Sequence, residues 1–112
     1  MRLSHREEAG VAILEPKGKI MGGPDATLLR DQLHEFIKQG KLKVVIDLAG
    51  VAWMNSTGLG ILISSLTTLR NNKGELKLAN VTEKIQSLLT ITRLITVFET
   101  HDSVAEALNS FN

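Results

Sequence analysis

Two adjacent hydroxyl side chains, Ser56 and Thr57, are the residues of this sequence best placed to carry chemistry. They follow Asn55 where an apolar helical pattern begins, so they lie at the expected start of a helix. The first backbone N–H groups of a helix have no partner within it, and the helix dipole is positive there. Asn55 or Ser56 can accept a hydrogen bond from one of these groups. Helix capping is therefore one interpretation of this segment.

Phosphorylation is the second interpretation, and the sequence leaves both open. A phosphate on Ser56 would be held by the free N–H groups at the helix start, so modification need not unfold the domain. It would add about −1.5 to −2 charges to any surface that docks on this end. Thr57 is a secondary candidate acceptor. We therefore predict a binding surface here that a kinase could switch.

Residues for catalysis or metal binding do not gather elsewhere in the sequence. The chain has no cysteine, which excludes disulfides and thiolate chemistry. No nucleophile elbow or phosphate-binding P-loop motif occurs. The three histidines lack the spacing of metal ligands, and each is predicted to be a lone surface or edge residue: His5, His34 and His101. We expect a protein that is not an enzyme, without catalytic residues, metal or cofactor.

Two further features each have a structural and a functional interpretation. Gly58 and Gly60 supply two glycines of a dinucleotide-binding loop, but close packing of a helix on a sheet explains glycines equally well. Trp53 is either a surface anchor for a partner or a residue partly buried under a loop. We favour the structural alternative for both.

Composition and charge narrow the class of protein. The 112 residues are 43% hydrophobic and 22% charged, which is typical of one globular domain over residues 1–112. The net charge is +1 and only 4% of residues are aromatic, so neither a basic stripe nor stacking platforms for nucleic acid are present. The charged N-terminus has no apolar signal core, and no apolar run is long enough to span a bilayer. We expect a cytoplasmic protein without a nucleic-acid or membrane partner.

Strand and helix patterns alternate along the chain. Strands are expected at residues 2–6, 11–14, 43–48, 75–78 and 95–98, the fourth of these half-exposed. Helices are expected from Pro24 to Gly40, from Asn55 or Ser56 to Asn71, after a Thr82 cap, and after a Ser103 capping box. The alternation predicts an α/β domain with a mixed, mostly parallel sheet and about four helices.

The sequence resembles the STAS domains, a family named for sulphate transporters and anti-sigma factor antagonists. The resemblance covers nearly the whole chain, and its centre is similar to the family motif Asp-Ser-[Ser/Thr]-Gly-Leu-Gly. The matching segments are Gly18 and residues 44–48, 53–60, 74–81 and 94–98.

The resemblance implies a stand-alone anti-sigma factor antagonist that works by switching partners. The unphosphorylated antagonist would bind an anti-sigma factor with a histidine-kinase-like ATPase fold and release the sigma factor. That partner would phosphorylate Ser56 and end the binding, and a PP2C-type phosphatase would reverse the modification. The residues expected to form the partner-binding surface are Met21, Gly22, Gly23, Trp53, Asn55, Ser56, Thr57 and Gly58.

Two positions depart from the family pattern. Asn55 stands where the motif has Asp, and Met21 stands where the family often has an acidic residue before the first helix. These departures keep an alternative open, a constitutive scaffold or accessory subunit of a stress-signalling or lipid-transport complex that is never phosphorylated. A small-ligand or nucleotide-binding domain using residues 55–60 is a third interpretation. Binding of the Ser56 variants and phosphorylation of Ser56 separate the first two.

Overall fold

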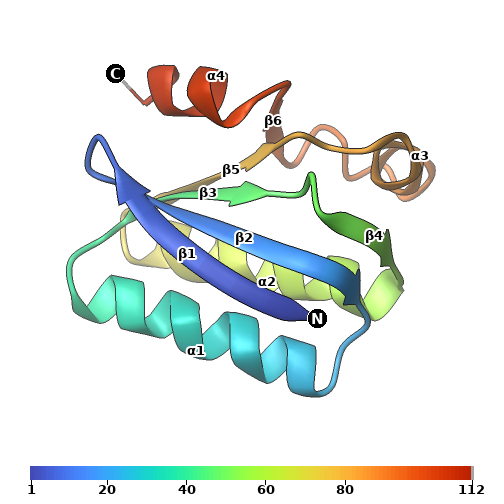
Figure 1. Cartoon of the computed structure of the whole chain (residues 1–112), viewed down its shortest axis with the longest axis horizontal. Helices are drawn as coiled ribbons and strands as arrows, with labels where there is room; N and C mark the ends of the chain where they lie inside the picture. Colours follow the sequence, from blue (N-terminus) through green and yellow to red (C-terminus); the bar gives the residue numbers. More distant parts are fainter. Residues whose placement is uncertain (112) are drawn as a thin grey trace.

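The computed structural model describes residues 1–111 as a single α/β domain (Figure 1). Asn112, the last residue of the domain expected over 1–112, lies outside the described residues. The strands are β1 (Arg2–Glu8), β2 (Val11–Ile20), β3 (Lys43–Asp47), β4 (Val51–Met54), β5 (Glu75–Ala79) and β6 (Glu99–His101). The helices are α1 (Pro24–Lys38), α2 (Ser56–Asn71), α3 (Glu83–Ile91) and α4 (Val104–Asn109).

The strands form one mixed sheet, in the order β1-β2-β3-β5-β6, with β4 pairing with the second half of β2. Only β1 is antiparallel to its neighbour, and the other pairs are parallel. The predicted fold class is therefore confirmed. Because β2 and β4 are parallel neighbours, their carboxyl ends lie at one edge of the sheet. The loop after Ile20 is thereby placed beside the start of the helix that follows Met54.

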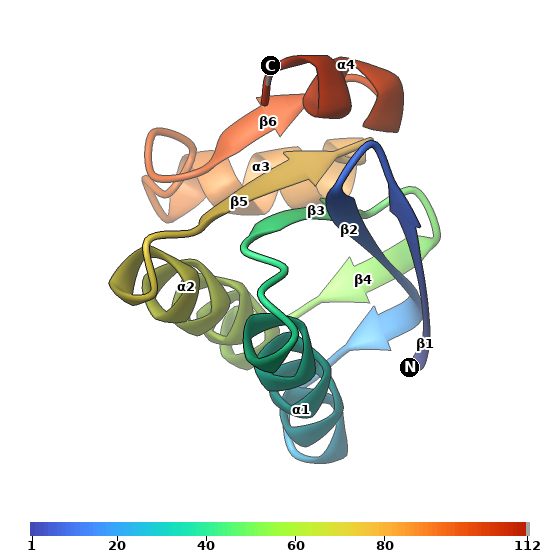
Figure 2. The same ribbon diagram turned by 90° about the vertical axis from the view of Figure 1, so that its left-hand side faces the viewer.

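Helices cover the two faces of the sheet unequally (Figures 1 and 2). Helices α1 and α2 pack side by side on one face, and α3 joins the same apolar core at the end near β4. The apolar residues that the sequence predicts for these helices supply buried side chains, among them Leu33, Leu62 and Leu89. Helix α4 lies alone on the opposite face, where a smaller core surrounds Ala107.

Strand β2 is longer than the sequence predicts. Residues 11–14 are buried in the strand as expected, but the strand continues past residue 14 to Ile20 and includes Gly18. Gly18 has a φ of 98° and marks a shift in the register between β2 and β4. A glycine inside a strand accommodates such a bulge because it has no Cβ. Strand β2 thus pairs with β3 before Gly18 and with β4 from Gly18 onward.

The expected strand at residues 95–98 is wrong, because these residues form turns and β6 follows them. The amides of Leu94 and Ile95 both donate to the carbonyl of Leu89, closing the end of α3. Phe98 is buried against the main core. The apolar run therefore serves helix termination and core packing, while the polar residues 99–101 pair with β5.

Strand β5 is buried on both faces, not half-exposed as its alternating sequence predicts. Lys77 lies under α4 with only 6% of its surface exposed. Its Nζ donates to Oε2 of Glu99 at 2.7 Å and to Oγ and O of Ser110 at 2.6 and 3.1 Å. The ammonium also lies 4.2 Å from the ring centre of Phe111. A buried charge is tolerated when it is paired and hydrogen-bonded in this way.

The predicted caps of α3 and α4 behave differently. Ser103 Oγ accepts from the amide of Glu106 at 3.1 Å, as a capping box requires, and the Glu106 carboxylate accepts from the Asp102 amide rather than from Ser103. Thr82 precedes α3 as predicted, but its hydroxyl makes no capping bond. The Thr82 hydroxyl oxygen is buried without a hydrogen-bond partner among residues 1–111.

Candidate functional site

Asn55 joins two loops at the start of α2. Its Oδ1 accepts from the amide of Gly58 at 2.8 Å, which confirms the predicted N-cap. Its Nδ2 donates to the carbonyl of Met21 at 3.1 Å, in the loop before α1. The amide side chain therefore uses an acceptor and a donor at once. A carboxylate could cap the helix but could not make the second bond.

Gly58 allows α2 to lie directly on the end of β2. A Cβ at this position would overlap the carbonyl oxygen of Ile20 and would lie 2.9 Å from Cγ of Met54. No residue except glycine fits without moving backbone. At Gly60, by contrast, nothing lies within 4 Å of an added Cβ. Close packing therefore accounts for the first glycine of the motif and leaves the second without a steric explanation.

Ser56 and Thr57, though adjacent, lie on different sides of α2. Both are exposed. Ser56 is the first residue of α2 and lines a groove that opens toward α3. Thr57 lines a second groove, between α1 and α2, together with Arg30 and His34. The predicted primary acceptor is therefore accessible at the positive end of the helix.

The loop over residues 21–23 packs against this helix start. Gly22 is buried with a φ of 103°, and an added Cβ would lie 2.5 Å from Cγ2 of Thr57. Met21 is 41% exposed, and its amide donates to Oδ2 of Asp25 at 3.1 Å. The other oxygen of Asp25 lies 3.5 Å from the amino group of Met1. The structure thus brings the predicted loop residues and the start of α2 together.

Trp53 stands on β4 rather than in the expected loop. The strand pairs with β2, and its two end residues, Val51 and Met54, are buried in the core, whereas the two residues between them are exposed. Trp53 is 44% exposed, which makes it one of the few large apolar side chains on the surface. The favoured interpretation of Trp53 as a residue partly buried under a loop is therefore wrong in its location, because the residue lies on a strand with its side chain on the surface.

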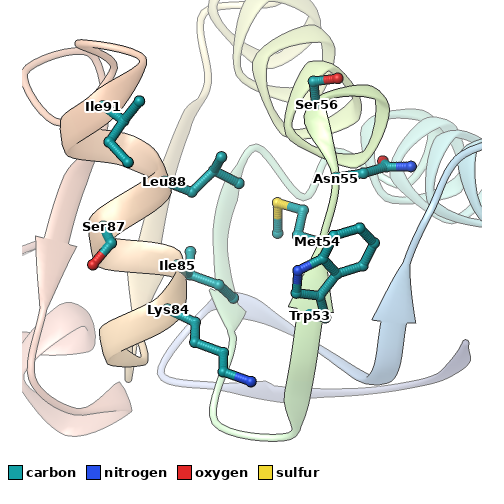
Figure 3. A pocket seen from close by; sticks show the side chains of 9 residues that line it. All are labelled: Trp53, Met54, Asn55, Ser56, Lys84, Ile85, Ser87, Leu88 and Ile91. Carbon is teal, nitrogen blue, oxygen red and sulfur yellow. The ribbon is translucent and has the colours of Figure 1, made fainter.

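A groove of about 520 Å³ lies between β4 and α3 (Figure 3). Its walls are mostly apolar, and its residues are Trp53, Met54, Asn55, Ser56, Lys84, Ile85, Ser87, Leu88 and Ile91. The contribution of α3 was not predicted as part of the site. The sequence held one signal of this contribution, because Ile91 is an apolar residue of α3 that lies outside the set of buried residues of this helix. Ile91 is 79% exposed, the most exposed large apolar residue among 1–111.

Asp47 and Glu75 have local structural partners. Oδ1 of Asp47 accepts from the amide of Ala49 and from Asn80 at 3.0 and 2.9 Å, and Glu75 pairs with Arg70 at 3.4 Å. The histidines lie on three separate elements, and residues 1–111 contain no group of three or more His, Cys, Asp or Glu able to hold a metal. No helix of the described chain has the length and apolarity to cross a membrane.

One carboxylate has a strongly shifted pKa. The hydrogen bond from Lys77, joined by a second from His101, lowers the pKa of Glu99 from 4.5 to about 2. His101 Nε2 lies 2.6 Å from the same Glu99 oxygen. This cluster holds α4 on the far face of the sheet from α2, so its charges serve the fold and not the Ser56 surface.

Comparison with known proteins shows the family to which the chain belongs. The chain is 36% identical over 69 residues to an anti-sigma-B factor antagonist of Bacillus subtilis, a match covering 62% of each chain. Its fold is similar to an anti-sigma factor antagonist from Mycobacterium paratuberculosis (TM-score 0.83, 21% identity, 97% and 92% of the two chains covered).

It is also similar to the phosphorylated form of the Bacillus cell fate determinant SpoIIAA, with a TM-score of 0.75, 14% identity, and 99% and 100% of the two chains covered. Identities this low show a shared fold and nothing further. The family model described as STAS domain matches residues 2–107, almost the entire chain. The chain belongs to the STAS domain family.

Proposed function

We propose that this protein is a cytoplasmic anti-sigma factor antagonist that is switched off by phosphorylation of Ser56. The observation that carries the proposal is the position of Ser56, exposed at the first residue of α2 and in one groove with the half-exposed Trp53. The matching B. subtilis protein bears the name of such an antagonist, which supports the same role. The function is regulatory binding without catalysis.

The partner-binding surface consists of the loop at residues 21–23, Trp53 and the start of α2. Met21 and Trp53 supply exposed apolar area, and aromatic residues are favoured anchors of interfaces. Gly22 and Gly58 keep the backbone close enough for these elements to form one surface. Asn55 fixes their relative position through its two hydrogen bonds.

Phosphate on Ser56 would oppose docking by electrostatics. The helix start stabilises the dianion in the free protein, so the fold persists. At a docked interface the same dianion must lose water, which costs several kcal/mol that the single lysine of its groove, Lys84, offsets only in part. A loss of about 3 kcal/mol weakens binding more than a hundredfold. The partner would be an anti-sigma factor with a histidine-kinase-like ATPase fold, and a PP2C-type phosphatase would restore binding.

A constitutive binding subunit is the second candidate, and one observation favours it. Asn55 replaces the acidic residue of the family motif, and its amide is committed to a bond that only a donor can make. The position thus serves to hold the loop, and a kinase that needs a carboxylate there would not act. In this candidate the same surface binds its partner permanently.

Affinity capture from host lysate with ATP tests the two candidates. The wild type would be compared with Ser56→Ala, Ser56→Asp and the matched control Ser64→Asp, which places the same charge on an exposed residue of α2 outside the β4–α3 groove. We expect a histidine-kinase-like ATPase with wild type, Ser56→Ala and Ser64→Asp but not with Ser56→Asp. Phosphate should appear on the Ser56 peptide. Equal capture by all four proteins, with Ser56 never modified, would establish the constitutive subunit instead.

A further inference from the structure

The groove between β4 and α3 has the chemistry of a peptide-docking site. We propose that it binds an extended segment of a partner protein whose apolar side chains are flanked by carboxylates. Three independent features of the groove indicate the three properties of this segment: an open strand edge, apolar walls and a lysine in its lining.

The open edge of β4 indicates that the docked segment of the partner is extended. Strand β4 pairs with β2 and with no other strand among residues 1–111, so one of its edges has no strand partner. Figure 3 shows α3 across the groove from that edge, on the side of β4 away from β2. Unpaired backbone groups along a strand edge accept an added strand through main-chain hydrogen bonds. The edge is short and protected by α3, which suits a segment of a few residues.

The walls of the groove call for apolar side chains. Trp53 from β4 and Ile91 from α3 stand on either side and are 44% and 79% exposed, and Leu88 lies between them in the groove. An exposed isoleucine and tryptophan facing one cavity are costly to leave in water. A partner that buries both side chains would remove this unfavourable exposure to water and so gain binding free energy, with Trp53 as the anchor.

The charges around the groove call for carboxylates. Among the described residues, Lys84 is the only charged residue that lines it. Lys19 pairs with Trp53 across β2 and β4, so this second exposed lysine lies on the far side of β4 and outside the groove lining. A docked segment thus meets the ammonium of Lys84 on the α3 side. Complementary charge at such a rim selects the partner and speeds its association.

The inference rests on the proposed function only for the identity of the partner protein. Ser56 lies in the same groove, so a phosphate there would repel the acidic flanks of the segment. The preference for apolar and acidic residues is independent of phosphorylation, and it can be tested with peptides.

The test uses displayed random peptides selected against the full chain. An enriched peptide is then made synthetically and titrated while the fluorescence of Trp53, the single tryptophan, is recorded. We expect enriched sequences with alternating apolar residues flanked by Asp or Glu, and a blue shift of the emission on binding. Selection of peptides without this pattern would overturn the proposal.

Matched variants locate the binding. Ile91→Asp should abolish peptide binding, whereas Leu28→Asp, at another exposed apolar residue, on α1 and outside the groove, should not. Lys84→Glu should weaken binding about tenfold or more, and Lys38→Glu on α1 should leave it unchanged. A peptide with Lys in place of its carboxylates should bind Lys84→Glu better than wild type. Peptides that bind Ile91→Asp as well as wild type would refute the site.

Two other occupants are outcomes of the same experiment. Self-association of the wild type that Ile91→Asp abolishes would show a second copy of the chain in the groove and overturn the proposal. A fatty acid retained by the purified wild type and absent from Ile91→Asp would do the same. If peptides fail while capture of the anti-sigma factor still depends on Ser56, the groove proposal alone is wrong. If peptides bind but no anti-sigma factor is captured, the proposed function alone is wrong.

Discussion

The side-chain amide of Asn55 donates to the carbonyl of Met21 at 3.1 Å while its oxygen caps α2. This one residue therefore connects the loop before α1 to the start of α2, across 34 positions of sequence. The geometry gives Asn at position 55 a structural reason, because Asp offers no donor to the Met21 carbonyl. The residue that departs from the family motif is thus the one that holds the loop before α1 against the start of α2.

The variant Asn55→Asp should separate capping from bridging. Asp caps a helix as well as Asn does, so the loss is the bond to Met21, worth about 1 kcal/mol of unfolding free energy. Asn55→Ala loses both bonds and should cost about 2 kcal/mol. Urea denaturation gives both values, and amide hydrogen exchange at Gly22 and Gly23 should quicken in both variants. Unchanged exchange in Asn55→Asp would show that the bridge does not hold the loop.

The two glycines of the motif should respond to alanine with opposite signs. Gly58→Ala forces a methyl group into the Ile20 carbonyl and should destabilise the protein by about 3 kcal/mol or more. Gly60→Ala adds a methyl in open space within a helix and should stabilise by about 0.5 to 1 kcal/mol. Thermal denaturation measures both, and a stable Gly58→Ala would contradict the close contact of α2 with β2.

The carboxylate of Glu99 should make stability depend on acid pH. Its pKa is lowered from 4.5 to about 2, so its contribution is complete above pH 4.5 and is lost as the pH falls through about 2. The side chain is half-exposed, so the contribution is about 1 kcal/mol and not the full value of the shift. Glu99→Gln should therefore be less stable than wild type at pH 7, with the difference vanishing near pH 2. Glu35→Gln, which removes an exposed carboxylate of α1, is the matched control.

The hydroxyl groups of Thr82 and Ser103, which precede α3 and α4, should contribute with opposite signs to the free energy of unfolding. Thr82→Val removes a buried hydroxyl that has no partner among residues 1–111, and should stabilise the protein by about 1 kcal/mol. Ser103→Ala removes a hydroxyl that accepts from Glu106, and should cost about 1 kcal/mol. Denaturation of the two variants in parallel checks the contrast. A destabilising Thr82→Val would mean that this hydroxyl has a partner in solution.

The sequence predicted what depends on local pattern. The helix over α2 and its Asn55 cap follow from spacing and side-chain chemistry within a few residues, and the position of Ser56 follows with them. The class of fold follows from the alternation of elements. The grouping of residues 21–23 with the start of α2 came from family resemblance and agrees with the parallel pairing of β2 and β4.

The remainder depended on partners distant in sequence. Lys77 is buried because α4 returns over β5, which an alternating strand pattern cannot show. The apolar residues 95–98 look like a strand, but Phe98 enters the core from a turn. The short β4 exists because β2 bends at Gly18 to meet it, and the groove exists because α3 lies across from that strand.

The divergent orientation of Ser56 and Thr57 makes the site of any phosphate as informative as its presence. A phosphate on Ser56 would sit in an apolar groove beside Trp53, whereas one on Thr57 would face Arg30 between α1 and α2. The first would block a partner that docks in the β4–α3 groove, and the second would lie in another groove, beside a guanidinium that pairs well with phosphate. Two singly phosphorylated forms of the protein, of equal mass and equal charge, would then differ in partner binding. Mass spectrometry must therefore fragment the peptide and localise the phosphate in order to distinguish the inactive form, phosphorylated on Ser56, from the active one.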